Sequence, residues 1–224
     1  MWHVAVAQGG GVNGLFPHPR VPREWTRKLT PEEVNQLPVR RWDGPIRLIR
    51  DDAEAEEAAA LLTRESVLGF DTETRPSFRK GENYFPALVQ LAGAETVYLF
   101  QLKGMERFDA LSAILSDPAR RKVGVGLDYD VRALQTIFSF QPRGFIDVGE
   151  VARRAAIASQ GLRGLAAHLF GMRISKRAQC SNWDNPELKP FQLVYAATDA
   201  WISREIYLRM HETGVFATPF APVG

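Results

Sequence analysis

The pattern of apolar and polar positions predicts regular secondary structure from Ile46 onward and little before it. Positions that are apolar every three or four residues predict helices, and short apolar runs bounded by turn residues predict strands. Strands are expected at Val67–Asp71, Ala87–Ala92, Thr96–Gln101, Lys122–Gly126 and Phe145–Val148. Helices are expected at Asp51–Thr63, around Glu106–Leu115, at about Asp128–Phe138 and over most of the remaining chain. Three early strands in succession, followed by strands that alternate with helices, predict an α/β fold, a mixed central sheet flanked by helices.

The first 44 residues lack this regularity. They contain three consecutive glycines, Gly9–Gly11, and prolines at positions 17, 19, 22, 31 and 38. Such residues interrupt helices and strands, so we expect only one turn of helix here, after Thr30. We predict a partly ordered N-terminal arm, residues 1–44, which Trp25 and Trp42 attach to the body of the protein. The other predicted parts are one domain, residues 45–213, and a C-terminal tail, residues 214–224.

The composition is that of a globular protein, with 224 residues of which 45% are hydrophobic and 24% charged. A net charge of +2 permits a nucleic-acid partner without requiring one. The single cysteine, Cys180, excludes an internal disulfide and a cysteine-rich zinc site. We expect Cys180 to be buried, and the four histidines show no ligand spacing. Neither a signal peptide nor a membrane-spanning run is recognisable, so we expect a cytoplasmic protein with no membrane partner.

Two carboxylates close the first predicted strand, whose sequence is VLGFDTET. Asp71 and Glu73 are two residues apart, so they project from the same face of an extended chain. The alternative is that both acids are simply solvated at the edge of the sheet.

A third carboxylate lies on the apolar face of the last helix. That face follows three- and four-residue spacing through Leu188, Phe191, Tyr195, Asp199, Ile202 and Ile206. An ionised carboxylate at such a position costs several kcal/mol unless a cation or hydrogen-bond donors compensate it. A buried arginine partner is the structural alternative to a functional site.

A further pair of acids begins the helix within KVGVGLDYDVRAL. Asp130 lies beside the apolar stripe of that helix, whereas Asp128 is expected to be its N-cap. The alternative for Asp130 is a favourable interaction with the helix dipole. Three separate elements therefore place acids at or near interior positions. Oxygen ligands that converge in this way favour Mg²⁺ or Mn²⁺, and two such ions can cleave phosphodiesters.

Three segments, FDTET, GLDYDVRAL and YAATDA, resemble in order and spacing the three motifs of the DEDD superfamily of 3′–5′ exonucleases. The last motif of that superfamily carries either a histidine five residues before its final aspartate or a tyrosine four residues before it. Val194 and Tyr195 occupy those positions here, so the chain resembles the tyrosine branch. Within that branch it is most similar to Werner-type exonucleases and stand-alone bacterial relatives, and ribonuclease D is more distant. Further matches are Gly69–Asp71, Ala87–Leu91, Gly161–Leu165 and Cys180–Trp183.

The resemblance implies a ribonuclease-H-like fold and a site for two ions, Mg²⁺ or Mn²⁺. It implies four metal ligands, Asp71, Glu73, Asp130 and Asp199, with Asp128 outside the ligand set. Tyr195, one helical turn from Asp199, is expected to orient the attacking water, because a phenol pKa of about 10 makes it a poor base at neutral pH. A tyrosine that only caps the core is the alternative.

Cationic and aromatic residues near the motifs are candidates for holding the substrate. They are Arg75, Arg79, Lys80, Phe85, Lys176 and Arg177, with Lys189 as a further cation. The alternative for each is an ordinary solvated surface position. Trp183 is expected to anchor its loop in the core, although stacking on a terminal base is a second reading. Leu88 and Gln90 are further residues that could line the site.

The predicted function is release of nucleoside monophosphates from the 3′ end of DNA by a two-metal-ion mechanism. The nearest alternative is the same chemistry on RNA, as in ribonuclease D. A second is a catalytically silent scaffold that binds nucleic acid or protein. A third is cleavage inside a strand, against which the motif set argues. The expected partner is a nucleic acid with a free 3′ end, DNA in preference to RNA.

Overall fold

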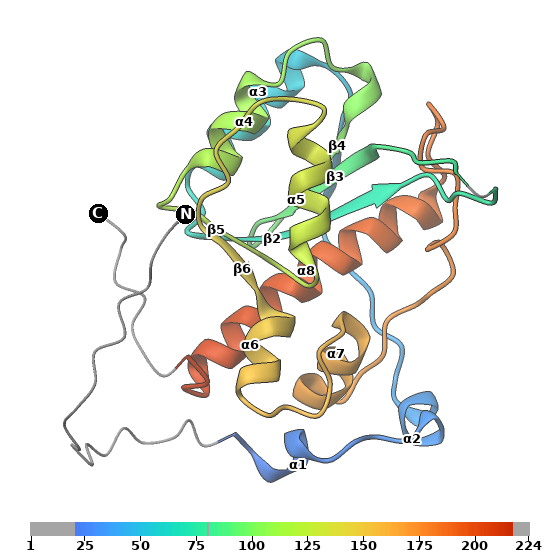
Figure 1. Cartoon of the computed structure of the whole chain (residues 1–224), viewed down its shortest axis with the longest axis vertical. Coiled ribbons are helices and arrows are strands. Elements are labelled where there is room, and N and C mark those ends of the chain that lie inside the picture. The colour runs from blue at the N-terminus through green and yellow to red at the C-terminus, as the bar shows by residue number, and fades with distance from the viewer. Residues whose placement is uncertain (1–20, 80, 217–224) are drawn as a thin grey trace.

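A computed structural model, which describes residues 21–79 and 81–216, shows a six-stranded sheet with helices on both faces (Figure 1). The strand order is β1-β4-β3-β2-β5-β6. The β2–β3 and β3–β4 pairs are antiparallel and the other three pairs are parallel. The strands are β1 (Ile46–Ile49), β2 (Val67–Thr74), β3 (Pro86–Ala92), β4 (Val97–Gln101), β5 (Arg121–Gly124) and β6 (Phe145–Asp147). The predicted α/β fold with a mixed sheet is confirmed.

The edge strand β1 was not predicted. Its four residues pair in parallel with β4, from Ile46 opposite Val97 to Ile49 opposite Phe100. A strand this short carries too little alternation to be recognised by pattern, and its partner lies about fifty residues away along the chain. It is therefore defined by pairing that only the folded sheet provides.

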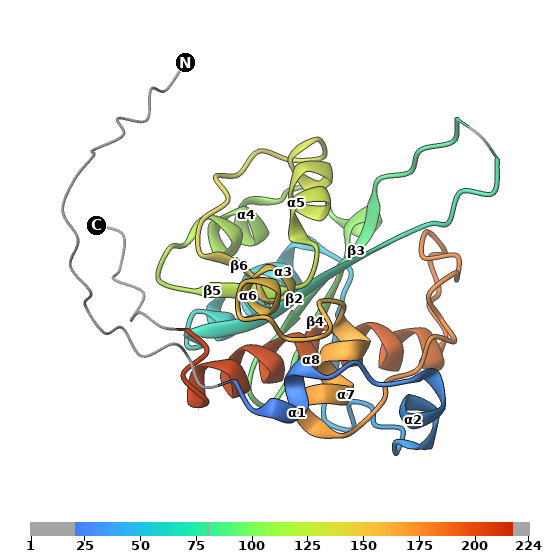
Figure 2. The same ribbon diagram turned by 60° about the horizontal axis from the view of Figure 1, so that its bottom comes forward.

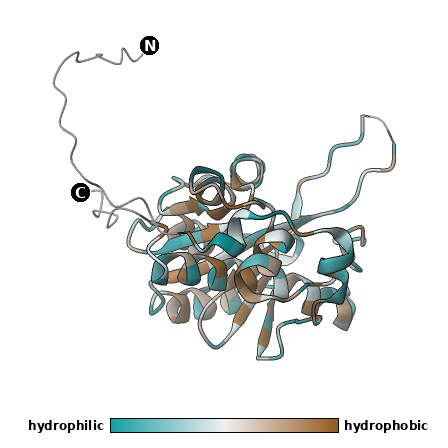
Figure 3. Cartoon of the chain, turned by 90° about the horizontal axis from the view of Figure 1, so that it is seen from below, coloured by the Kyte–Doolittle hydropathy of each residue, from teal (hydrophilic) through white to brown (hydrophobic). Residues whose placement is uncertain are grey.

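Two layers of helices enclose the sheet (Figures 1 and 2). Leu68 and Phe70 of β2 pack with the helices of one layer, and Leu88 and Leu99 pack under the longest helix of the other. Brown and teal stretches lie side by side along these helices in Figure 3, as expected for helices with one buried face. The first layer holds α3 (Asp52–Leu62), α4 (Asp109–Ser116) and α5 (Leu127–Gln135); the second holds α6 (Val148–Arg154), α7 (Leu162–Phe170) and α8 (Pro190–Glu212).

Helix α8 crosses the central strands and approaches β2 very closely at Gly69. A Cβ atom added at Gly69 would lie only 1.9 Å from the carbonyl oxygen of Ala200. Because side chains alternate along a strand, Asp71 and Glu73 lie on the same α8-facing side of β2 as Gly69. The absence of a side chain at Gly69 thus lets α8 pack directly over the strand that carries the two acids.

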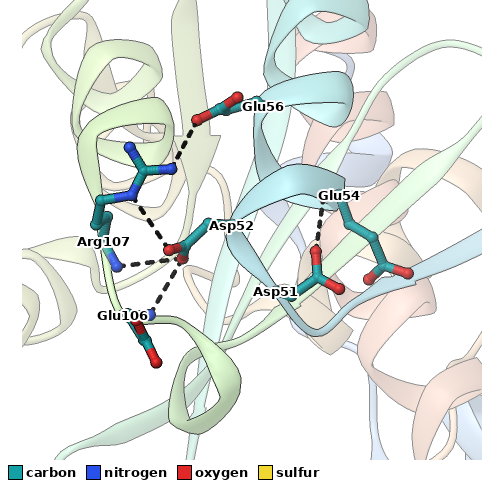
Figure 4. A network of polar contacts seen from close by, with 6 residues as sticks. All are labelled: Asp51, Asp52, Glu54, Glu56, Glu106 and Arg107. Atoms are coloured by element: carbon teal, nitrogen blue, oxygen red, sulfur yellow. Dashed lines mark hydrogen bonds and ion pairs between the residues drawn. The ribbon is translucent and has the colours of Figure 1, made fainter.

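Helix α4 begins three residues later than predicted because the preceding backbone is bound elsewhere. The N–H groups of Glu106 and Arg107 both donate to Asp52 Oδ1 at 3.1 Å, and the guanidinium of Arg107 also reaches Glu56 (Figure 4). These bonds attach the segment between the short 3-10 helix η1 (Leu102–Gly104) and α4 to the N-terminus of α3. Asp51 caps α3 by accepting the N–H of Glu54.

The chain from residue 21 to 44 packs against the second helix layer, with α1 (Arg23–Thr26) beside α7 and α2 (Pro31–Gln36) further along (Figure 2). Thr30 forms a capping box with Glu33, which confirms the predicted helical turn. Trp25 is 5% exposed, and the N–H of Trp42 donates to Thr198 Oγ1 at 3.0 Å. Both tryptophans attach the arm as predicted. Residues 1–20 of the arm and 217–224 of the tail lie outside the described residues.

Two positions in the C-terminal third differ from their predictions. Phe191 is 44% exposed, because it lies on the outer side of the first turn of α8, whereas Gln192 in the same turn is buried. Cys180 is exposed, because it lies in the irregular segment between α7 and α8. Within the ranges that the structure describes, none of the helices combines the length and apolar character needed to cross a bilayer.

Candidate active site

Four carboxylates from three elements face one another at the end of β2. Asp71 and Glu73 lie on β2, Asp130 lies in the first turn of α5, and Asp199 lies near the middle of α8. Their proximity is evident in their mutual electrostatics, because Asp199 and Asp130 both raise the pKa of Asp71. The structure therefore brings together all four acids that the sequence motifs singled out.

Thr72 holds two of these carboxylates in place. Its backbone N–H donates to Asp71 Oδ1 at 2.8 Å, and its hydroxyl donates to Asp130 Oδ1 at 2.7 Å. Because Thr72 points to the opposite face of β2 from its neighbours, its side chain can reach α5. Sequence reasoning did not single out Thr72, and only the folded distance between β2 and α5 reveals its contact.

The start of α5 is set by a glycine turn and a distant aspartate. Gly126 has a φ of 74°, and its N–H donates to Asp147 Oδ2 at 2.9 Å. Asp147 is the last residue of β6, and its Oδ2 also accepts the N–H of Leu127 at 3.3 Å. The prediction that Asp128 is the N-cap is therefore wrong. Asp128 lies inside the first turn and points to solvent, with its side chain 95% exposed.

Asp199 is buried without a hydrogen bond to one of its oxygens. It is 5% exposed, and its Oδ1 atom has no hydrogen-bond partner. The alternative of a buried arginine partner is not observed: the ion pairs of the described residues do not include Asp199. Arg163 is close enough to lower the Asp199 pKa by its charge, but its guanidinium donates to the Ser175 carbonyl oxygen instead.

Burial raises the pKa of every carboxyl group in this cluster, and repulsion from the neighbouring acids raises the pKa of Asp71 and Glu73 further. Burial is the largest cause at each position, and it raises the pKa of Asp199 to about 7 and that of Glu73 to about 10. The pKa of Asp71 is raised well above its usual value, and that of Asp130 is also raised. The protein's own cations therefore do not neutralise this cluster, and an added cation would stabilise its ionised form.

Tyr195 lies one helical turn before Asp199 on α8. Burial, followed by the charges of Asp199 and Glu73, raises the Tyr195 pKa above its ordinary value. The phenol thus stays protonated at neutral pH and can donate a hydrogen bond. Its ring also packs in the core, 6.0 Å from the ring of Trp183. Trp183 is fully buried, so its predicted anchoring role is confirmed.

The donor set fits hard divalent cations, although the side chains do not form a closed cage. Within residues 21–79 and 81–216, no three His, Cys, Asp or Glu side chains already have the arrangement of a formed metal site. All four groups are nonetheless oxygen donors, and the unpaired, buried Oδ1 of Asp199 requires a partner. These carboxylates would have to reorient to coordinate an ion.

A cavity of about 420 Å³ opens over this cluster. Asp71, Glu73, Tyr195 and Asp199 form one side. The cavity is also lined by the N-terminus of α7, whose Gly161 cap provides no side-chain hydrogen bond, and by further polar residues. Those lining residues include Arg163, Lys176 and Gln179. The free N–H groups of the first turn and the two cations make this part of the cavity suited to phosphate.

The predicted substrate residues separate into two groups. Lys176 lines the carboxylate cavity and Arg177 lines an adjacent cavity, so both lie at the site. Arg75 and Phe85 line a different cavity of about 320 Å³, at the base of the segment that joins β2 to β3. This segment projects from the body in Figure 2, with Arg79 exposed on it. Lys80 lies outside the described residues.

Several polar residues at the site were missed or left open by sequence reasoning. Arg163 and Gln179 line the carboxylate cavity, and Arg40 and Arg41 line the adjacent one. Arg163 lies in the family-matched segment Gly161–Leu165 but was assigned no role there, and tertiary contacts bring all four residues to the site. Gln90, directly opposite Asp71 on β3, is fully buried, and both atoms of its amide lack a hydrogen-bond partner.

Comparison with known proteins identifies a matching family model, described as 3′–5′ exonuclease, which covers residues 46–214. The mouse bifunctional 3′–5′ exonuclease/ATP-dependent helicase WRN is 32% identical over 173 residues, which is 75% of this chain and 12% of the mouse protein. The human exonuclease mut-7 homolog is 30% identical over 200 residues, which is 77% of this chain and 23% of the human protein. The chain therefore spans less than a quarter of the length of these two relatives.

Solved structures share the fold. The Aedes aegypti Nibbler EXO domain superposes with a TM-score of 0.69 at 22% identity, covering 80% of this chain and 93% of that domain. Escherichia coli RNase D superposes with a TM-score of 0.68 at 24% identity, covering 75% of this chain and 45% of RNase D. These similarities support the predicted ribonuclease-H-like arrangement of sheet and helices.

Proposed function

Because the chain belongs to the 3′–5′ exonuclease family, we propose that it releases nucleoside monophosphates from the 3′ end of DNA with the help of two divalent metal ions. The observation that carries this proposal is the meeting of Asp71, Glu73, Asp130 and Asp199 from three elements, with all of these acids except Asp130 lining one cavity. Exonucleases of this type generally use divalent metal ions. Mg²⁺ and Mn²⁺ suit a ligand set made only of oxygen atoms.

The four carboxylates would hold the ions. The charges of Asp199 and Asp130 both act on Asp71, which would therefore be the residue that contacts both ions. Glu73 and Asp199 would help to hold one ion, and Asp130 would help to hold the other. When bound, the ions would lower the pKa of a water molecule and stabilise charge on the departing 3′ oxygen. Thr72 keeps the carboxylates of Asp71 and Asp130 oriented.

The remaining groups of the cavity would place the scissile phosphate and the attacking water. Tyr195 donates a hydrogen bond and orients the water, since its raised pKa excludes it as a base near neutral pH. Arg163, Lys176 and the N-terminus of α7, which line the same cavity, would neutralise phosphate charge. Water is thereby held between the carboxylates and the phosphate.

RNA is the second candidate substrate. The mouse relative is named as an exonuclease and helicase, and the Werner-type motif matches favour DNA. Against this, the RNase D structure is described as that of an exoribonuclease involved in structured RNA processing. Degradation ladders of 5′-labelled single-stranded DNA, 3′-recessed duplex DNA and RNA, in Mg²⁺ and in Mn²⁺, would decide between them. DNA is expected to shorten faster.

Matched variants make the same assay a test of the site. Asp71→Asn and Asp199→Asn are expected to abolish shortening, whereas Asp128→Asn, an exposed acid two residues from Asp130, is expected to retain it. A strand with a blocked 3′ end should remain intact, since continued cutting would show cleavage within the strand. If the unmodified protein and the Asp71 variant both left every substrate uncut, the scaffold alternative would replace the enzyme.

A further inference from the structure

A second cavity meets the carboxylate cavity at α8. It has a volume of about 390 Å³, and Tyr195 and Asp199 line both cavities. This volume falls within the range of roughly 300–1,000 Å³ that is usual for small-ligand sites. A strand whose terminal nucleotide occupies the carboxylate cavity therefore has adjoining space for its next nucleotide.

Three arginines surround this second cavity without carboxylate partners. Arg40 and Arg41 come from the arm, and Arg177 comes from the segment before α8. In the part of the chain that the structure describes, none of the three forms an ion pair. Uncompensated guanidinium groups around a concave surface attract anions, and they bind phosphates in particular.

The arm is held firmly on both sides of Arg40 and Arg41. The backbone N–H of Arg40 donates to the Arg173 carbonyl oxygen at 2.9 Å, and the N–H of Arg173 donates to the Pro38 carbonyl oxygen at 3.0 Å. Two residues later, the N–H of Trp42 donates to Thr198 Oγ1 of α8. These bonds place the two arginines at the rim of the cavity. Arg40 and Arg41 also precede residue 46, where the match to the family model begins.

An exposed aromatic ring completes the cavity. Phe191, in the first turn of α8, is 44% exposed and lies 5.9 Å from the guanidinium carbon of Arg177. An exposed ring next to cations is the combination that binds single-stranded nucleic acid, because bases stack on the ring while the cations neutralise the phosphates. The exposed position of Phe191, which was expected to be buried, thus makes its ring available for stacking on a base.

We propose that this cavity, the arginine pocket, binds the retained strand of the substrate next to the nucleotide that is removed. The proposal rests on the proposed function and deepens it. Arg40, Arg41 and Arg177 neutralise phosphates, and Phe191 stacks on a base. The arm is then part of the substrate site, because Arg40 and Arg41 lie outside the family-matched region, residues 46–214.

Binding of a labelled 12-nucleotide single strand tests the proposal directly. Fluorescence anisotropy in Ca²⁺, on an Asp71→Asn background that prevents cutting, gives the Kd over a series of salt concentrations. Arg40→Ala/Arg41→Ala is expected to weaken binding by about tenfold and to reduce the slope of log K against log salt by about 1.4, since each lost phosphate contact on a single strand removes about 0.7. Phe191→Ala is expected to weaken binding by roughly tenfold.

Arg64→Ala/Arg143→Ala is the matched control. Both residues are exposed arginines that line none of the described cavities, and this pair of changes removes the same net charge. The control should bind within twofold of the parent, and Arg40→Lys/Arg41→Lys should keep the parent's salt slope. Equal binding by the arm variant and the control would overturn the proposal, as would weaker binding with an unchanged slope.

Two further measurements distinguish binding of the retained strand in this pocket from binding of the released nucleotide there. With Asp71 restored, the arm variant should raise the KM for the 12-mer and keep kcat within twofold. Inhibition by a nucleoside 5′-monophosphate should be unchanged, because the released nucleotide occupies the carboxylate cavity. If inhibition weakens instead, the arginine pocket holds the product and the proposal is wrong. If the unmodified protein cuts no nucleic acid, the proposed function fails, while the anisotropy comparison still reports on the pocket.

Discussion

The close approach of α8 to β2 at Gly69 can be tested by adding a single methyl group. In Gly69→Ala the new Cβ would lie 1.9 Å from the Ala200 carbonyl oxygen and 2.8 Å from its carbonyl carbon. Ordinary van der Waals contact begins near 3.4 Å, so α8 must retreat by roughly 1.5 Å. Both atoms struck are backbone atoms, so rotation of a side chain does not relieve the clash. Overpacking of this kind costs about 1–3 kcal/mol of unfolding free energy.

The same displacement should impair the site, because Asp199 immediately precedes Ala200. Moving α8 outward separates Asp199 from Asp71, and a misplacement of about 1 Å can reduce a rate by about a hundredfold. We therefore expect kcat for 3′-end removal to fall by about that factor, together with weaker Mn²⁺ affinity. Urea unfolding, single-strand degradation and Mn²⁺ titration measure the three quantities.

Gly171→Ala is the control that separates stability from geometry. Gly171 ends α7 with a φ of 59°, and nothing lies within 4 Å of its added Cβ. A left-handed alanine costs about 1–2 kcal/mol, which matches the stability loss in the first variant without moving α8. Its kcat should stay within twofold of the parent. Equal kcat values for Gly69→Ala and Gly171→Ala would refute the reasoning.

Three further outcomes follow from the described contacts. Trp25→Ala should lower the unfolding free energy by about 3–5 kcal/mol in a urea titration, because it leaves a cavity where the arm packs against α7. A change below about 1 kcal/mol would show that the arm does not contribute to stability. Tyr195→Phe should lower kcat by about tenfold or more while leaving Mn²⁺ affinity within twofold, and a loss of affinity would point to a ligand role. In metal-free buffer, thermal stability should fall from pH 5 to pH 8, because folding raises the Asp199 pKa to about 7 and the stability present below pH 4 is lost as Asp199 ionises. Asp199→Asn should flatten this profile. Mn²⁺ should raise the wild-type Tm more at pH 8 than at pH 5. Identical profiles for wild type and Asp199→Asn would contradict the assignment of this pKa.

The parts of the site that sequence predicted are those encoded by local periodicity. Asp71 and Glu73 share a face because a strand repeats every two residues, and Asp199 is buried because a helix repeats about every 3.6. These regularities hold within one element and do not depend on the partner element. The strands and helices that contain the motifs were located for the same reason, with bounds that shifted by up to three residues.

The parts that sequence did not predict depend on contacts between distant segments. Asp147, rather than Asp128, accepts the N–H groups at the start of α5, although about twenty residues separate them along the chain. Arg40 reaches the site because its backbone bonds to that of Arg173. Phe191 is exposed because it lies on the outer side of the first turn of α8, while Gln192 of the same turn is buried. In each case the residue type was visible, and its position became clear only once the fold was known.

Anomalous X-ray scattering from crystals soaked in Mn²⁺ and a nucleoside 5′-monophosphate tests most directly whether bound dications hold the four carboxylates together. We expect manganese peaks within about 2.5 Å of carboxylate oxygens of Asp71, with Glu73 and Asp199 turned toward the same ion. Crystals of Asp71→Asn should lose these peaks. No manganese at this position, with Asp199 rotated onto the guanidinium of Arg163, would contradict the assignment of the cluster as a metal site.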